Sequence, residues 1–159
     1  MTVGGEFRPP AWLAHPHVQS IFPSMPLRRP GVERRCAPLL RASRPEVLDC
    51  GDGVRLLAHR ATQAALGRTP AQRVAVLLHG WEGSARSSYI QHSAAELLAA
   101  GLDVFALNFR DHGETHNLNE GLFHSCRQQE IVDAAKAVLR QCRPQRFFVA
   151  GYSLGGNFA

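Results

Sequence analysis

Three short apolar runs are the clearest pattern along the chain. They occupy residues 74–78, 104–107 and 147–150, and each is followed at once by a polar or glycine-rich segment. A continuous apolar run of this length is typical of a strand in a parallel sheet that is buried on both faces. We therefore predict three buried strands.

Two amphipathic segments separate these runs. Residues 88–100 carry an apolar stripe at helical spacing and stop at a glycine, and residues 127–140 carry a second stripe before Pro144. Ser125 and Gln128 have capping-box spacing at the start of the second helix. Strand, helix, strand, helix, strand predicts right-handed crossovers, and therefore a mostly parallel sheet with helices on both faces.

The segment upstream of the first run has a different pattern. Residues 46–50 and 54–61 flank a turn-forming Gly-Asp-Gly cluster, which favours an antiparallel hairpin, and residues 62–72 are expected to be a loop. Residues 1–45 are rich in Pro and Arg and have no sustained period. We expect them to form an N-terminal arm, with regular structure beginning near Glu46 in a domain of residues 46–159.

Composition and charge restrict where we expect the protein to be located and which partners we expect it to bind. No apolar run approaches the roughly 20 residues that cross a bilayer, and the N-terminus lacks the order of a secretory signal, so we expect a cytoplasmic protein without stable membrane insertion. The net charge of +5 comes from scattered arginines, which favours a solvated surface over nucleic-acid binding. Four cysteines without CxxC spacing are expected to be reduced. The oligomeric state is left open.

The third run leads into the most specific motif of the sequence. Residues 151–155 read Gly-Tyr-Ser-Leu-Gly and fit G-x-S-x-G directly after a strand. In this context Ser153 would stand on a tight strand-to-helix turn as a nucleophile, with Gly151 and Gly155 keeping side chains out of crowded backbone. The alternative is a glycine-rich turn whose serine merely caps a helix.

The loop after the first run is the expected partner of this turn, because the carboxyl ends of parallel strands share one edge. The backbone N–H groups of Trp81 and Leu154 are candidate donors of an oxyanion hole. The alternative is a simple strand-to-helix turn in which Trp81 only packs. We expect His79 and Gly80 to support the loop, and His79 to be structural rather than the catalytic base.

The loop after the second run, residues 108–116, is polar and could order the pocket. A metal site made from four of the nearby residues is the alternative (His112, His116, His124 and Cys126). This HxxxH pair falls in a loop without the glutamate-bearing helix of metalloproteases. The sequence therefore favours a hydrogen-bonded loop, with no metal and no cofactor.

Five segments together carry a family resemblance. They are residues 9–12 (PPAW), 15–20 (HPHVQS), 79–84 (HGWEGS), 108–113 (NFRDHG) and 151–157 (GYSLGGN). With these motifs the chain resembles the YheT-like hydrolases, AB hydrolase family 4. The resemblance implies an α/β-hydrolase fold and a cytoplasmic serine hydrolase of the carboxylesterase or monoacylglycerol-lipase type, with Ser153 as nucleophile. It implies a small-molecule or lipid ester as substrate.

The chain departs from this family in length. The triad order of the fold is Ser, then Asp or Glu, then His, and only six residues follow Ser153. We therefore expect the triad Asp and His to be absent, the fold to be truncated after the nucleophile turn, and activity to be weak. Two alternatives stay open: an acyl-CoA:alcohol acyltransferase of the same fold, and a non-catalytic fragment.

Overall fold

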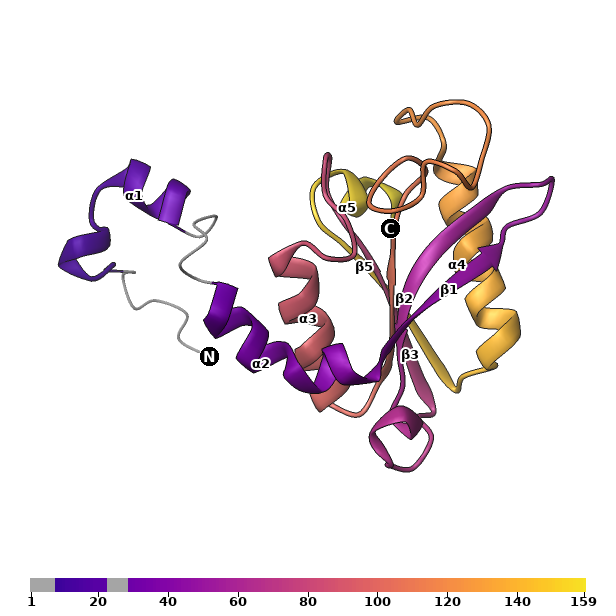
Figure 1. The fold of residues 1–159 in the computed structure, drawn as a ribbon, viewed down its shortest axis with the longest axis horizontal. Helices are drawn as coiled ribbons and strands as arrows, with labels where there is room; N and C mark the ends of the chain where they lie inside the picture. Colours follow the sequence, from indigo (N-terminus) through magenta and orange to yellow (C-terminus); the bar gives the residue numbers. More distant parts are fainter. Residues whose placement is uncertain (1–7, 23–28) are drawn as a thin grey trace, which may run out of the picture. The chain divides into compact units, whose positions relative to one another are not determined.

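The computed structural model describes residues 8–22 and 29–159, and the chain divides into two compact units, Met1–Arg34 and Arg35–Ala159 (Figure 1). In the first unit a short 3-10 helix, η1 (Ala11–Leu13), precedes α1 (Pro16–Ile21). The His15 side chain accepts a hydrogen bond from the His17 backbone N–H at 3.2 Å and so caps α1. The arm predicted for residues 1–45 stays a prediction.

The expectation that regular structure begins near Glu46 is wrong. Helix α2 (Arg29–Ala42) precedes the first strand, which starts at Ser43. Its signal in the sequence is weak because Pro38 lies inside the helix and arginines interrupt the apolar positions. Three of its residues are nonetheless buried in the second unit, and their spacing is helical (Cys36, Leu39 and Ala42).

The second unit is built on a five-stranded mixed sheet in the order β1-β2-β4-β3-β5. β1 and β2 form the predicted antiparallel hairpin, β2 also runs antiparallel to β4, and β3 runs parallel to both β4 and β5. All the predicted strands are present (β1, Ser43–Asp49; β2, Arg55–Ala61; β3, Arg73–Leu78; β4, Asp103–Leu107; β5, Arg146–Gly151).

Helices cover both faces of this sheet, as predicted (Figure 1). α3 (Ser88–Ala99) contacts β3 and β4, whereas α4 (Gln128–Cys142) contacts β1 on the other side. Each helix buries an apolar stripe (Ile90, Ala94 and Leu98; Ile131, Ala134 and Val138). A short 3-10 helix, η4 (Ala64–Leu66), lies in the predicted loop, and α5 (Leu154–Phe158) follows β5.

The start of α4 differs from the prediction. The N-cap is Arg127, and no side chain caps the helix, so the capping box proposed for Ser125 and Gln128 is wrong. Arg127 instead donates from Nε to the Leu122 carbonyl at 2.9 Å and pairs with Glu130 at 2.8 Å. These contacts fix how the preceding loop enters the helix, which local spacing cannot reveal.

The core lies between α4 and the sheet. Phe105, Phe109, Leu56 and Leu78 are completely buried in it, and Phe158 of α5 closes one end. Within the described ranges no helix has both the length and the apolar character needed to cross a bilayer.

Candidate active site

The loops that follow β3, β4 and β5 meet at one edge of the sheet, as expected for parallel strands. The Tyr152 backbone N–H donates to the Leu78 carbonyl at 3.0 Å, which joins the ends of β5 and β3. The Phe109 backbone N–H donates to His79 Nε2 at 3.2 Å, which joins the ends of β4 and β3. The residues singled out in the three loops are therefore brought together.

Ser153 occupies a strained turn between β5 and α5. Its φ of 51° and ψ of −117° lie in a region that residues with a side chain rarely adopt, and its side chain is exposed. A Cβ on Gly155 would lie 2.5 Å from the carbonyl oxygens of Leu78 and His79, and one on Gly151 would overlap the Gly155 carbonyl. The two glycines are required because backbone passes where a side chain would stand.

The loop after β3 runs directly beside this serine. A Cβ on Gly80 would lie 3.3 Å from the Cβ of Ser153, so Gly80 leaves room for the serine side chain. Within residues 8–22 and 29–159, the backbone N–H groups of Trp81 and Leu154 have no hydrogen-bond acceptor. Leu154 is the first residue of α5, where a backbone N–H has no partner within the helix.

His79 is held in a single neutral form. It is completely buried; Nδ1 lies 2.7 Å from the Gly80 carbonyl oxygen, and Nε2 accepts the Phe109 N–H. A carbonyl can only accept, so Nδ1 carries the hydrogen. Burial, with a smaller contribution from the charge of neighbouring His112, lowers the pKa of His79 to about 4 even though the Gly80 hydrogen bond opposes the shift. Both ring nitrogens are therefore engaged with the backbone.

Two tyrosines that the sequence did not single out join the loop after β3 to the serine turn. Tyr89 Oη on α3 accepts the Gly80 backbone N–H at 3.0 Å, and its ring lies 4.9 Å from the ring of Tyr152. Tyr152 Oη in turn hydrogen-bonds Ser93 Oγ of α3. Tyr152 stands at a variable position of G-x-S-x-G, and Tyr89 is the second residue of α3, so neither position carries a signal of its own.

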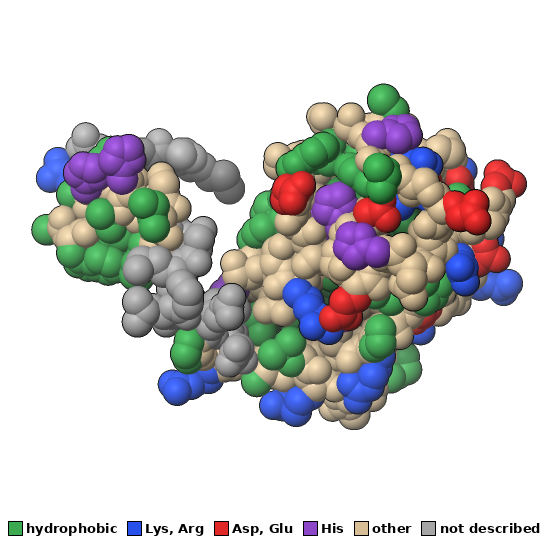
Figure 2. Space-filling view, turned by 45° about the horizontal axis from the view of Figure 1, so that its top comes forward, with side chains coloured by type: hydrophobic (Ala, Val, Ile, Leu, Met, Phe, Trp, Pro, Cys, Tyr) green, Lys and Arg blue, Asp and Glu red, His purple; other side chains and the backbone are tan. Residues whose placement is uncertain are grey.

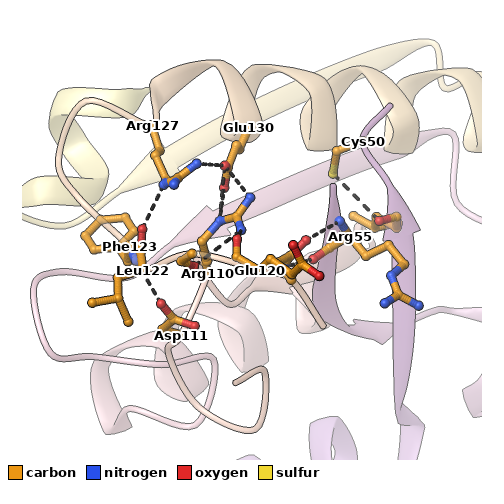
Figure 3. A network of polar contacts seen from close by, with 12 residues as sticks. Cys50, Arg55, Arg110, Asp111, Glu120, Leu122, Phe123, Arg127 and Glu130 are labelled. Atoms are coloured by element: carbon orange, nitrogen blue, oxygen red, sulfur yellow. Dashed lines mark hydrogen bonds and ion pairs between the residues drawn. The ribbon is translucent and has the colours of Figure 1, made fainter. Parts of the chain in front are cut away.

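The loop after β4 is held by a network of ion pairs and hydrogen bonds (Figure 3). Arg110, with a side chain only 5% exposed, pairs with Glu130 of α4 at 2.7 Å, and Glu130 also binds Arg127. The Asp111 carboxylate accepts the Phe123 backbone N–H at 2.8 Å. In the part of the chain that the structure describes, no three His, Cys, Asp or Glu side chains are grouped as metal ligands.

A surface cleft opens between the loops that follow β3 and β4. Its volume is about 440 Å³, and residues 81–83 and several residues between 111 and 123 line it. Trp81 lines the cleft and is 60% exposed, and Phe123, which also lines it, contacts Trp81 edge to face with 6.0 Å between the ring centroids. The lining of this loop cleft therefore includes the residue whose backbone N–H was predicted to bind an oxyanion.

Comparison with known proteins identifies the fold. The family described as alpha/beta hydrolase fold matches residues 74–159, which is more than half of the chain. No curated protein matches the sequence.

Several solved structures share the arrangement. A serine hydrolase without a lid from Xanthomonas campestris is 22% identical with a TM-score of 0.59, and the match covers 73% of this chain and 53% of that one. An esterase from Pyrococcus furiosus is 20% identical with a TM-score of 0.63, covering 77% and 46%. The chain thus spans about half the length of these structures. At these identities the likeness establishes the fold, and with the family match it shows that the chain belongs to the α/β-hydrolase fold family.

Proposed function

We propose that this chain carries the nucleophile half of a serine hydrolase that cleaves carboxylic esters through an acyl-serine intermediate. The observation that carries the proposal is the Ser153 turn, whose positive φ and two obligatory glycines hold an exposed hydroxyl above the sheet edge. Backbone strain of this kind persists only where the surrounding structure enforces it, and it clusters at catalytic positions.

The reaction would run as follows at this edge. Ser153 Oγ attacks the ester carbonyl carbon and gives its proton to a histidine base, and the carbonyl oxygen becomes an oxyanion. The free backbone N–H groups of Trp81 and Leu154 are the donors for that oxyanion, an interaction worth about 3 kcal/mol per donor in the transition state. The alcohol leaves with the proton, and water then releases the acid from the serine.

The base would be a residue outside this chain. His79 is a poor candidate because both of its ring nitrogens already bind backbone groups and burial lowers its pKa to about 4. We propose that the triad Asp and His follow Ala159, which agrees with a chain that spans about half of the matched structures. Assignment to the YheT-like family, lipase-like substrates and a cytoplasmic location rest on the sequence motifs and stay predictions.

The test is active-site labelling of the protein expressed with its native downstream sequence. A fluorophosphonate probe should form one adduct that peptide mapping places on Ser153, together with hydrolysis of 4-nitrophenyl butyrate. Ser153→Ala should abolish both, and Ser125→Ala, at an exposed serine in the loop before α4, should leave both unchanged. Full hydrolysis by Ser153→Ala, or an adduct on another serine, would overturn the proposal.

A further inference from the structure

The charge of the loop cleft runs against that of the whole chain. The sequence carries a formal charge of +5, yet among the described residues the titratable side chains lining the cleft are Glu82, Asp111, His112 and His116, with no Lys or Arg. On the face seen in Figure 2, acidic and histidine side chains of the larger unit stand beside hydrophobic ones. Cationic ligands are favoured in a cleft with this lining, and anionic ligands are repelled.

Among the described residues the carboxylates of Glu82 and Asp111 lack a lysine or arginine partner, and the one ion-pair contact is the one between Asp111 and His116. By contrast, Glu46, Glu114 and Glu130 each pair with an arginine. The Asp111 side chain is only 17% exposed. The side chain paired with it is that of His116, whose Nδ1 lies 4.0 Å from Asp111 Oδ1. A partly buried carboxylate without a cation interacts more strongly with a bound charge than an exposed one does.

Aromatic faces complete the lining. Trp81 is 60% exposed and meets Phe123 edge to face, whereas the Phe123 ring also stacks on Phe109 and contacts His112, so Trp81 offers the open aromatic face. The face of an aromatic ring attracts a cation, and tryptophan does so best. His112 is held in this lining because its Nδ1 lies 2.8 Å from the Arg110 carbonyl oxygen and donates to it.

We propose that the loop cleft binds an organic cation of the alkylammonium class, with its charge between Glu82 and Asp111 and its methyl groups against Trp81 and Phe123. The neighbouring Trp81 backbone N–H places this subsite beside the reacting carbonyl, so that it would receive the alcohol half of a cationic ester. That second step rests on the proposed function, whereas binding of the cation itself does not.

Fluorescence of Trp81 tests the binding directly. The chain has two tryptophans, Trp12 and Trp81, so Trp12→Phe leaves Trp81 as the single reporter. Tetramethylammonium chloride should change its emission saturably, whereas sodium chloride of equal ionic strength and the neutral isostere tert-butanol should not. Glu82→Gln should weaken tetramethylammonium binding about threefold to fivefold, the size expected for one charge contact at a partly exposed site.

Two further variants make the result specific. Asp111→Asn should weaken binding at least as much because Asp111 is the more buried carboxylate, and the fold should be kept because an asparagine oxygen can still accept the Phe123 N–H. Glu120→Gln removes the same charge from the same loop but outside the cleft lining, and it should leave binding unchanged. The proposal is overturned by an absent or unsaturable response, by equal binding of tert-butanol, or by an equal loss in Glu120→Gln.

The substrate step is tested separately with two esters of butyric acid. The choline ester and the uncharged 3,3-dimethylbutyl ester have nearly the same shape, so the ratio of their kcat/KM values reports the charge alone. The protein with its native downstream sequence should favour the choline ester about threefold or more, and Glu82→Gln should bring the ratio close to one. Equal rates on both esters would overturn the alcohol subsite and leave the proposed function standing. If neither ester is cleaved while 4-nitrophenyl butyrate is, the alcohol subsite is overturned and the proposed function stands. If 4-nitrophenyl butyrate is not cleaved either, the proposed function fails, and the fluorescence titration still decides whether the cleft binds cations.

Discussion

β3 and β5 are neighbours in the sheet with similar sequences and opposite surroundings. Val76 of β3 and Val149 of β5 face each other in register, yet Val76 is 1% exposed and Val149 is 37% exposed. β3 lies between β4 and β5, whereas β5 stands at the end of the strand order. An apolar run therefore predicts a strand. Whether that strand is buried depends on whether another strand pairs with each of its two edges, which the run itself does not specify.

The apolar surface beside β5 extends beyond the strand. Phe147 and Val149 share a groove of about 210 Å³ with Ile131 and Leu139 of α4 and with Phe158 of α5. Phe148, on the other face of the strand, is 45% exposed. The prediction of a strand at residues 147–150 is confirmed, and the prediction that it is buried on both faces is wrong for the described structure.

The turn that follows β5 should break this contrast, because Gly155 at the start of α5 packs directly against the backbone at the end of β3. Gly155→Ala would drive a Cβ into the carbonyl oxygens of Leu78 and His79, which lie 2.5 Å from its position. We expect a loss of at least about 3 kcal/mol in the free energy of unfolding, or detachment of α5, because backbone atoms cannot move aside as side chains can. Urea denaturation measures the first outcome, and hydrogen exchange of α5 amides measures the second.

Gly156→Ala is the matched control for this substitution. A Cβ on Gly156 would come no closer than 3.4 Å to its neighbours, which is an ordinary contact, and alanine favours a helix over glycine. This variant should retain the stability of the parent within about 0.5 kcal/mol or exceed it. Equal losses in the two alanine variants would contradict the packing argument.

His79, the residue that follows β3, should sharpen the contrast, because its burial makes the free energy of unfolding depend on pH. Burial holds the pKa of His79 at about 4, below its ordinary value of 6.5 in the unfolded chain. Between these values the unfolded state binds the additional proton, so the free energy of unfolding falls as pH falls from about 6.5 towards 4. The contribution of His79 to this loss should be about 2 kcal/mol between pH 7 and pH 5.

Urea denaturation at the two pH values provides the measurement. The loss of stability between pH 7 and pH 5 should be about 2 kcal/mol smaller in His79→Asn than in the parent. His124→Asn, which changes an exposed histidine in the loop before α4, should keep the parent's pH dependence. If His79→Asn loses as much stability on acidification as the parent, His79 is not buried in its neutral form.

Sequence patterns predicted the strands, helices and turns that depend on residues close together in the chain. Apolar runs and helical stripes placed β3, β4, β5, α3 and α4, and strand direction placed their loops at one edge. The G-x-S-x-G motif located the turn because both glycines answer a local steric demand. The roles of Ser153, Trp81 and Leu154 stay predictions that the labelling experiment tests.

Patterns failed where distant segments decide the structure. The start of α4 is set by ion pairs that Glu130 makes with Arg110 and Arg127, and Arg110 is 20 residues away. Tyr89 binds the loop after β3 through one hydroxyl, which no periodicity encodes. Helix α2 was missed because its buried positions, one turn apart, are embedded among arginines and a proline. The start of α4, the Tyr89 hydrogen bond and the burial of α2 all depend on contacts between segments that are distant in the sequence.

The smallest expected effect is the most direct test of the comparison between β3 and β5. Val76→Ala and Val149→Ala remove the same two methyl groups from residues that face each other in register. Val76 is enclosed, so its truncation leaves a cavity and should cost about 2 kcal/mol in the free energy of unfolding. Val149 is partly exposed, and its truncation should cost about 0.5 kcal/mol.

The difference of about 1.5 kcal/mol should appear in urea denaturation as a shift of the midpoint with an unchanged slope. An equal cost for the two truncations would mean that β5 is as enclosed in solution as β3, with its outer apolar face covered. That face is open in the described part of the chain, so this outcome would show that a further segment or a second molecule packs on it. A larger cost for Val76 would confirm that position in the sheet, rather than apolar character alone, determines how much each valine contributes to stability.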